Sequence, residues 1–268
     1  MKQYWKNKVV LVTGGSAGLG QLIGEAFASA GARVVLAAID AEGLERVAGG
    51  LKSAGHEAVG ILTDITQQDQ VDALIGQTID TFGGLDVLVN CAGRSTRGEA
   101  LATGPDKFRE LLELNFFALV RCTQAAAPHL IRAGGHLVNI GSLAAKTASR
   151  YLGAYPASKF PVAAYSQQLR YELNPQGVHV LLVCPGPIAR VDAGRRYDED
   201  AAGLPESARE PGAGAKIRGI PPEKLVSKIL RYCERRKPEL VMPRRARLLF
   251  AISQLSPSLG DWIIRKMT

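Results

Sequence analysis

The amino-acid sequence predicts one α/β domain, a doubly wound parallel sheet of about seven strands flanked by helices. Its 268 residues are 46% hydrophobic and 22% charged, which is typical of a globular domain of this size. Short β-branched apolar runs, typical of strands covered on both faces, alternate with segments of helical apolar spacing. The first such run, at 9–12, is followed directly by a glycine-rich turn and the start of a helix.

The strands are expected where apolar runs are bounded by charged residues, Gly, Asn or Asp. We place them at 9–12, 33–38, 57–62, 85–90, 135–140, 177–183 and 239–242. Apolar residues at helical spacing indicate helices between these strands, for example at 44–51 and 71–79, and one long helical segment over 108–131.

The turn after the first strand has the composition of an anion-binding site. Gly14, Gly18 and Gly20 allow positive φ or a close approach of the backbone to a ligand. Ser16 can cap the helix that Leu19 continues. A helix N-terminus carries free N–H groups and a partial positive charge, so a pyrophosphate fits there. Taken alone, three glycines are equally typical of a tight structural turn.

The wider pattern identifies a family resemblance. The spacing Thr13-Gly14-x-x-x-Gly18-x-Gly20 resembles the nucleotide turn TGxxxGxG of the short-chain dehydrogenase/reductase family. Further family-like elements are N-C-A-G at 90–93, Ser142 after the fifth strand, Tyr-x-x-x-Lys at 155–159, and Pro185-Gly186. The resemblance covers residues 8 to about 242 and implies a Rossmann-type domain. It also implies an NAD(P)-dependent oxidoreductase that interconverts a secondary alcohol and a ketone, or an alcohol and an aldehyde, and a homodimer or homotetramer.

The resemblance assigns the chemistry to Asn115, Ser142, Tyr155 and Lys159. Tyr155 would be the general acid/base and Ser142 would hold the substrate oxygen. Lys159 would lower the pKa of the phenol from its usual value of about 10 and bond the nicotinamide ribose. Asn115 would hold the water through which protons are replaced. For Asn115 the alternative is a satisfied core amide, and for an isolated Tyr-x-x-x-Lys pair it is a surface helix contact.

The cofactor-binding residues implied by the resemblance are Gly14, Ser16, Gly18, Leu19, Gly20, Ala38, Ile39, Asp40, Asp64, Ile65, Asn90, Ala92, Gly93, Tyr155, Lys159, Pro185, Gly186 and Ile188. An acid at the end of the second strand would bond the ribose 2′-OH and repel a 2′-phosphate. Ala at position 38 removes that repulsion, whereas the missing basic residue at Ile39 and the nearby Asp40 favour NAD. On balance we expect NADP, with NAD as the alternative. Asp64 is also a suitable turn residue before the next helix.

Composition excludes several other classes. The four cysteines and four histidines are scattered, with no C-x-x-C pair and no His at ligand spacing, so neither a metal site nor a disulfide framework is expected. The net charge of +8 is concentrated at the C-terminus, where residues 190–268 hold 17 Lys and Arg against 10 Asp and Glu. This distribution argues against nucleic-acid binding. No apolar window reaches membrane-spanning length, and we expect a cytoplasmic protein.

Two segments add expectations of their own. Residues 189–219, rich in Gly, Pro and charge, are expected to form a substrate lid. The catalytic domain would end at 243, and 244–268 would be a basic amphipathic tail with an interfacial Trp262. Such a tail can lie peripherally on an anionic membrane, and its alternatives are packing on the domain itself or on a second subunit. Its apolar character favours a hydrophobic small-molecule substrate.

The competing functional hypothesis is a non-catalytic dinucleotide-binding regulator or scaffold anchored by the basic tail. The four filled catalytic positions weigh against it, because a binding module has no physical need for the tyrosine–lysine pair.

Overall fold

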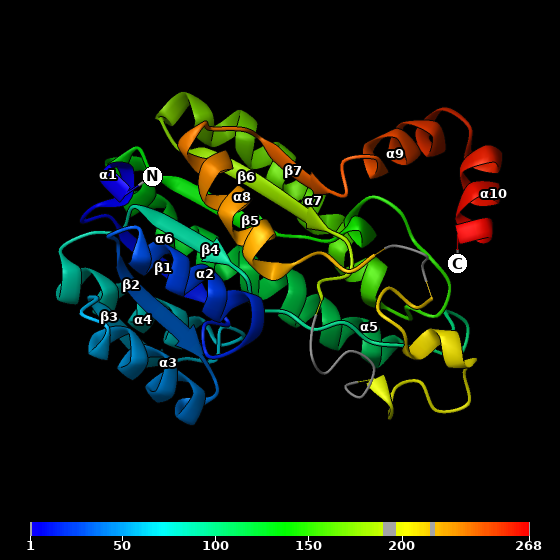
Figure 1. Ribbon diagram of the computed structural model, residues 1–268, viewed down its shortest axis with the longest axis horizontal. Helices are drawn as coiled ribbons and strands as arrows, with labels where there is room; N and C mark the ends of the chain where they lie inside the picture. The colour runs from blue at the N-terminus through cyan, green and yellow to red at the C-terminus, as the bar shows by residue number, and fades with distance from the viewer. Residues whose placement is uncertain (1, 190–196, 215–217, 268) are drawn as a thin grey trace.

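The computed structural model describes residues 2–189, 197–214 and 218–267. Its centre is a parallel sheet of seven strands in the order β3-β2-β1-β4-β5-β6-β7 (Figure 1). The strands are β1 Val9–Thr13, β2 Arg33–Ala38, β3 Ala58–Leu62, β4 Val87–Asn90, β5 His136–Ile140, β6 His179–Pro185 and β7 Glu239–Met242. The predicted fold class is therefore confirmed. The boundaries of β6 differ from the predicted 177–183, because Gly177 takes φ +84° and belongs to the preceding turn.

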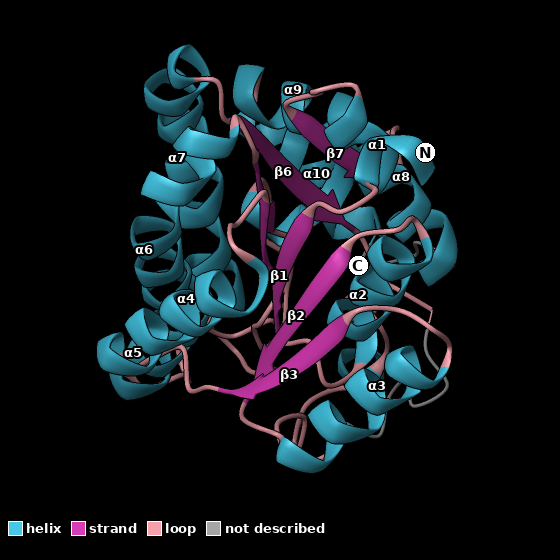
Figure 2. Ribbon diagram, turned by 90° about the vertical axis from the view of Figure 1, so that its left-hand side faces the viewer, coloured by secondary structure: helices cyan, strands magenta, loops and turns pink. Residues whose placement is uncertain are grey.

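The helices form a layer on each face of the sheet (Figure 2). They are α1 Lys2–Trp5, α2 Gly18–Ser29, α3 Ala41–Ser53, α4 Gln68–Phe82, α5 Pro105–Leu112, α6 Ala118–Ala133, α7 Tyr155–Leu173, α8 Pro222–Glu234, α9 Ala246–Leu255 and α10 Pro257–Met267. Helices α2, α3 and α8 cover one face, and α4, α6 and α7 cover the other. Among the helices described, none has both the length and the apolar content needed to cross a bilayer.

The burial of β1 explains why the strands are continuous apolar runs. Val10 and Val12 pack into the cluster under α2 and α8, whereas Val9 and Leu11 pack into the cluster under α4 and α6. Successive side chains of a strand point to opposite faces, and here both faces are covered. The strand order also places β1 beside β4, so the chain leaves these two neighbours toward opposite faces. A crevice at their carboxyl ends is the expected ligand site of such a sheet.

The predicted helix over 108–131 is interrupted. Helix α5 ends at Leu112, a π-helical turn spans Glu113–Phe117, and α6 begins at Ala118. Asn115 lies in this π turn and is 1% exposed. A π turn inserts one residue into the helical repeat and so changes the direction of the side chains within it, a device often found at functional sites.

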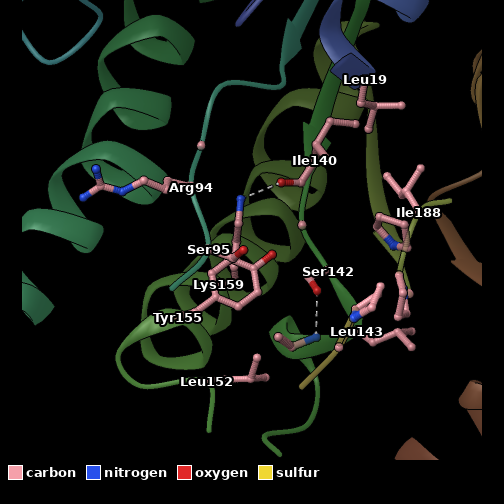
Figure 3. A pocket seen from close by; sticks show the side chains of 18 of the residues that line it. Leu19, Arg94, Ser95, Ile140, Ser142, Leu143, Leu152, Tyr155, Lys159 and Ile188 are labelled. Atoms are coloured by element: carbon pink, nitrogen blue, oxygen red, sulfur yellow. Dashed lines mark hydrogen bonds between the residues drawn. The ribbon is translucent and has the colours of Figure 1, made fainter. Parts of the chain in front are cut away.

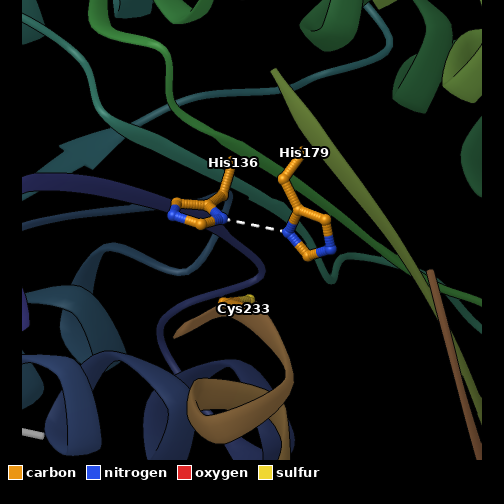
Figure 4. A group of neighbouring side chains, drawn as sticks. All are labelled: His136, His179 and Cys233. Atoms are coloured by element: carbon orange, nitrogen blue, oxygen red, sulfur yellow. Dashed lines mark hydrogen bonds between the residues drawn. The ribbon is translucent and has the colours of Figure 1, made fainter. Parts of the chain in front are cut away.

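Two histidines lie together at the amino ends of the strands, on the side of the sheet away from the crevice (Figure 4). His136 begins β5 and His179 begins β6, and they are partners in the parallel register. Their Nδ1 atoms are 3.0 Å apart, His136 Nε2 is 2.8 Å from Tyr4 Oη, and His179 Nε2 is 2.9 Å from the Lys237 carbonyl oxygen. Because a carbonyl only accepts, His179 Nε2 carries a proton. A chain of hydrogen bonds therefore runs from the Tyr4 hydroxyl through His136 and His179 to the Lys237 carbonyl oxygen.

No sequence pattern predicted this histidine pair, because the two residues are 43 positions apart in the sequence. With Cys233 of α8 the two histidines offer metal-ligand atoms within 4.8 Å of one another, and the hydrogen-bond chain accounts for all four ring nitrogens. Burial lowers the pKa of His136 to about 3 and that of His179 to about 4, so both rings are neutral at pH 7.

The expected lid at 189–219 is described in its central part only. Residues 190–196 and 215–217 lie outside the described residues. A bridge between Ile188 and Ile220 joins the two ends of the segment, and residues 206–209 form a short 3₁₀ turn.

Candidate active site

A cavity of about 960 Å³ opens at the carboxyl ends of the central strands. The predicted site residues that line it are Gly14, Ser16, Leu19, Gly20, Ala38, Ile39, Asp64, Ile65, Ala92, Gly93, Ser142, Tyr155, Lys159, Pro185, Gly186 and Ile188. The predicted residues outside the lining are Gly18, Asp40, Asn90 and Asn115. The sheet thus brings together segments from residue 14 to residue 188.

The glycine turn is packed too closely to carry side chains. Gly14 has φ +69°, and a Cβ there would lie 2.9 Å from Ala92 Cα. A Cβ on Gly20 would clash with the carbonyl oxygen of Gly14. The N-cap of α2 is Ala17 and makes no side-chain hydrogen bond, so the prediction that Ser16 caps this helix is wrong. The first N–H groups of α2 therefore have no side-chain acceptor, which suits the binding of a pyrophosphate.

The residues after β2 bear on the choice between NAD and NADP, for which Ala38 and Asp40 gave conflicting indications in the sequence. Asp40 Oδ1 accepts a hydrogen bond from Gly43 N at 3.0 Å and caps α3. Arg46, one turn further along α3, donates from Nη2 to the Ser16 carbonyl oxygen at 3.0 Å. The acid is thus occupied at the helix start, and a cation lies beside the glycine turn. No sequence motif marked Arg46, because only the packing of α3 brings it there.

Both sequence interpretations of Asp64 are compatible with its position. Its carboxylate accepts from Thr66 N at 2.9 Å and from Thr66 Oγ1 at 2.7 Å, and this turn leads to α4. The residue also lines the cavity beside Ile65, on the side of β3.

The turn after β4 is fixed to the glycine turn by Thr13. Thr13 Oγ1 accepts from Cys91 N at 3.0 Å and from Ala92 N at 3.2 Å. Asn90 points into the sheet, where its Nδ2 donates to Asn139 Oδ1 at 3.0 Å and to Thr123 Oγ1 at 3.1 Å. Asn90 therefore stabilises the sheet, and residues 92 and 93 provide the surface of the cavity.

Ser142, Tyr155 and Lys159 face the same cavity (Figure 3). Lys159 is 5% exposed, and its Nζ donates to the Ile140 carbonyl oxygen at 3.0 Å. Ser142 Oγ accepts from Ala144 N at 3.1 Å, so the hydroxyl proton of Ser142 remains available to another acceptor. Tyr155 is the first residue of α7, which places it one turn before Lys159 on the same helix face.

Burial dominates the proton affinities of this group. It raises the pKa of the Tyr155 phenol, and a hydrogen bond from Ser142 and the charge of Arg97 act in the opposite direction. Burial also lowers the pKa of Lys159 to about 8, so this ammonium can release a proton near neutral pH. The influence of Lys159 on the phenol stays a prediction, since in this structure the groups that lower the pKa of Tyr155 are Ser142 and Arg97.

The side chain of Asn115 connects three segments behind the cavity. Its Nδ2 donates to the Arg94 carbonyl oxygen and to Ser158 Oγ, both at 2.8 Å, and its Oδ1 accepts from Arg94 N at 2.8 Å. Ser158 Oγ in turn donates to the Tyr155 carbonyl oxygen at 2.8 Å. The π turn therefore fixes the first turn of α7. This is the satisfied buried amide of the alternative interpretation, and it also positions the tyrosine.

No motif in the sequence pointed to Arg97. The residue is 6% exposed, and it donates from Nε to the Ala208 carbonyl oxygen at 2.6 Å and from Nη2 to the Glu210 carbonyl oxygen at 3.2 Å. Tyr197 lines the cavity, and its hydroxyl lies 2.9 Å from Ser95 Oγ. The loop after β4 thus holds the segment 197–214 over the cavity. A lone basic residue in a loop carries no pattern that would predict this.

Comparisons with known proteins bear on the family and the fold. Residues 8–202 match the family model for short chain dehydrogenases. A "Dehydrogenase/reductase SDR family protein 7-like" of Drosophila melanogaster is 30% identical over 275 residues, covering 97% of this chain and 80% of that protein. "Ketoacyl reductase HetN" of Nostoc is 29% identical over 266 residues, covering 96% and 88%. A crystal structure of a short chain dehydrogenase/reductase from Burkholderia phymatum in complex with NAD superposes with a TM-score of 0.82 at 22% identity, over 95% of each chain.

Proposed function

The chain belongs to the short-chain dehydrogenase family, and we propose that it uses NADP to interconvert a hydrophobic secondary alcohol and its ketone, or an alcohol and its aldehyde, with Tyr155 as the general acid/base. The observation that most supports this proposal is the arrangement of Ser142, Tyr155 and Lys159 in one cavity with the glycine turn. A dinucleotide bound along that cavity supplies or accepts a hydride at its nicotinamide.

The protein groups supply the proton. In reduction, Tyr155 donates its phenolic proton to the carbonyl oxygen of the substrate. Ser142 donates a second hydrogen bond to that oxygen by turning its hydroxyl proton from Tyr155 to the substrate, while its oxygen still accepts from Ala144 N. These two donors stabilise the negative charge that develops on the oxygen. In oxidation, the same two groups act in reverse, and the phenolate of Tyr155 removes the proton of the alcohol.

Lys159 and Asn115 help to return a proton to the Tyr155 phenolate after each reduction. The buried Lys159 ammonium, with its pKa lowered to about 8, can reprotonate a phenolate without a large energetic cost. The buried Asn115 amide orders the loop after β4 and the start of α7, between which a proton-carrying water would be held. Lys159 would also bond the ribose next to the nicotinamide.

Three features support NADP over NAD. Position 38 carries no acid to repel a 2′-phosphate, Asp40 is occupied in capping α3, and Arg46 lies beside the glycine turn. A guanidinium is well suited to bind a phosphate group.

The decisive experiment is Tyr155→Phe, measured with a panel of apolar ketones and NADPH. Loss of turnover by about a thousandfold or more, with NADPH still bound, is expected if the phenol is the proton donor. A variant as active as wild type would refute the mechanism. An absence of turnover in the wild type across the panel, together with tight NADPH binding, would instead favour the regulator or scaffold.

We further propose that the outer side of α9 and α10 contacts an anionic membrane. Leu255 is 88% exposed and Trp262 is 50% exposed, and Arg244, Arg245 and Arg247 precede the apolar stretch. Sedimentation with phosphatidylserine vesicles should be weakened by Trp262→Ser and by high salt, and phosphatidylcholine vesicles should bind less. Binding of both vesicle types equally, or of neither, contradicts this proposal.

A homodimer or homotetramer is proposed as the assembly state, in line with the family. Light scattering of the purified protein gives the mass directly. Dissociation to the monomer on Leu255→Ser would assign these exposed residues to a subunit contact instead of a membrane contact.

A further inference from the structure

The two C-terminal helices follow the last strand and form a bent helix pair, here called the α9–α10 hairpin. Three residues separate helix α9 from β7, and α10 then turns at a steep angle to α9, at the side of the molecule farthest from the N-terminus (Figure 1). A Cβ on Gly260 would collide with Ser253, so the two helices touch closely at that point. Ala246 is buried, and Phe250 packs on the core cluster that contains Leu119 and Val162. The hairpin is therefore attached to the domain at the start of α9.

The catalytic cavity extends to the inner face of this hairpin. Its wall includes Leu249 and Ile252 of α9 and Ile263 and Met267 of α10, in the same continuous space that is lined by Tyr155. These side chains are half-buried. At about 960 Å³ the cavity is at the upper end of the range for small-molecule sites, which suits a dinucleotide and a sizeable substrate together.

The chemistry of this wall restricts what can bind there. The side chains that α9 and α10 contribute to the cavity are all apolar, and Arg245, which precedes α9, also lines it. A polar group placed against them would lose its hydration without gaining a hydrogen bond, whereas each apolar CH₂ group would gain free energy. The family model ends at residue 202, so the hairpin lies outside the part of the chain that it describes.

We propose that the α9–α10 hairpin forms a subsite for an unbranched alkyl chain of the substrate, whose carbonyl or hydroxyl group lies at Tyr155. This inference rests on the proposed oxidoreductase function and narrows the substrate to long-chain aliphatic ketones, aldehydes and alcohols. We infer that the substrate itself occupies this subsite, because the cavity is continuous from Tyr155 to Leu249. A molecule held by its oxygen at Tyr155 can therefore reach Leu249 without leaving the cavity.

The first test is a homologous series of methyl ketones, from four to fourteen carbons, with NADPH. In the wild type, kcat/KM should rise about three- to fourfold for each added CH₂ and then level off when the groove is filled. Leu249→Ser should flatten this dependence. Leu255→Ser is the matched control, because Leu255 lies on the same helix, is exposed and is not part of the cavity wall. It should keep the wild-type slope.

Several outcomes would overturn the subsite. Turnover that is independent of chain length would do so while leaving the oxidoreductase function intact, and so would equal slopes in the two leucine variants. If Leu249→Ser does not fold, as judged by thermal unfolding, Ile263→Ser on the other helix provides the same test.

A second test needs no turnover. Parinaric acid, a fluorescent polyene fatty acid, should bind the Tyr155→Phe variant, and adding Leu249→Ser should weaken binding by about tenfold whereas adding Leu255→Ser should not. Binding that depends on Leu249, together with no ketone turnover by the wild type, would refute the proposed reaction and retain the subsite. Binding that is insensitive to both substitutions would refute the subsite.

Discussion

The guanidinium carbon of Arg97 lies 3.6 Å from the centre of the Tyr197 ring, across a sequence distance of a hundred residues. Together with the hydrogen bonds from Arg97 to the carbonyl oxygens of Ala208 and Glu210, this contact joins the loop after β4 to the segment over the cavity. Arg97 also lowers the pKa of Tyr155. One buried cation therefore affects both the cover of the site and the acid within it.

Arg97→Met should loosen this cover. Charge-assisted hydrogen bonds are worth about 1.5–3 kcal/mol each, so we expect kcat/KM to fall by at least tenfold, mainly through KM. Trypsin should cleave at Arg209 faster than in the wild type, whereas NADPH affinity should be retained. Arg97→Lys should restore activity only in part, because an ammonium lacks the planar fork of donors. The exposed Arg109→Met is the control, and unchanged KM and cleavage in Arg97→Met would contradict this role.

Arg46→Met should change the choice of cofactor. Loss of the cation beside Ser16 is expected to weaken NADPH binding by about tenfold and to leave NADH binding within a factor of two. Fluorescence titration of both cofactors measures this ratio. Arg33→Met, whose guanidinium bonds the Asn7 carbonyl at the opposite edge of the sheet, serves as the control. An equal loss for both cofactors would show that Arg46 has only a structural role.

Gly14→Ala should disrupt the cofactor turn. A side chain at φ +69° costs about 1–2 kcal/mol, and the added Cβ would also press on Ala92. We expect at least tenfold weaker NADPH binding, measured by titration, with the protein still folded. In contrast, Gly76→Ala lies in the exposed middle of α4 with nothing within 4 Å of the new Cβ. It should raise the free energy of unfolding by about 0.5–1 kcal/mol and leave cofactor binding unchanged.

The buried histidines should make the protein sensitive to acid. Their pKa values, about 3 and about 4 in the folded protein, lie below the unfolded value near 6.5. The unfolded state therefore binds more protons between pH 6.5 and pH 4, and stability falls as the pH is lowered through this window. Each histidine contributes about 1.4 kcal/mol per pH unit. Urea unfolding measured from pH 7 to pH 5 should show a smaller fall in the free energy of unfolding per pH unit in His179→Gln than in the wild type.

Several parts of the fold and site could be predicted from the sequence because their signals are local. The strands are apolar runs because both faces of the sheet are covered, so each buried strand can be recognised from its own residues. The glycine turn and the pair Tyr155 and Lys159 carry fixed spacings within a few residues. Strand ends shifted by up to two positions where a glycine turn such as Gly177 decided the boundary. The cap of α2 was wrongly assigned to Ser16 because backbone geometry, and not residue type, places the N-cap at Ala17.

The sequence by itself determined the sheet and the glycine turn, because each of these follows from residue type and short spacing, and its family resemblance predicted Ser142, Tyr155 and Lys159 as the reacting side chains. The tertiary structure alone decided which distant groups meet. Parallel register placed His136 against His179, the packing of α3 brought Arg46 to the glycine turn, and chain folding over the cavity set Arg97 against Tyr197. Contacts between residues tens of positions apart arise from the relative placement of whole elements, and no local pattern records that placement.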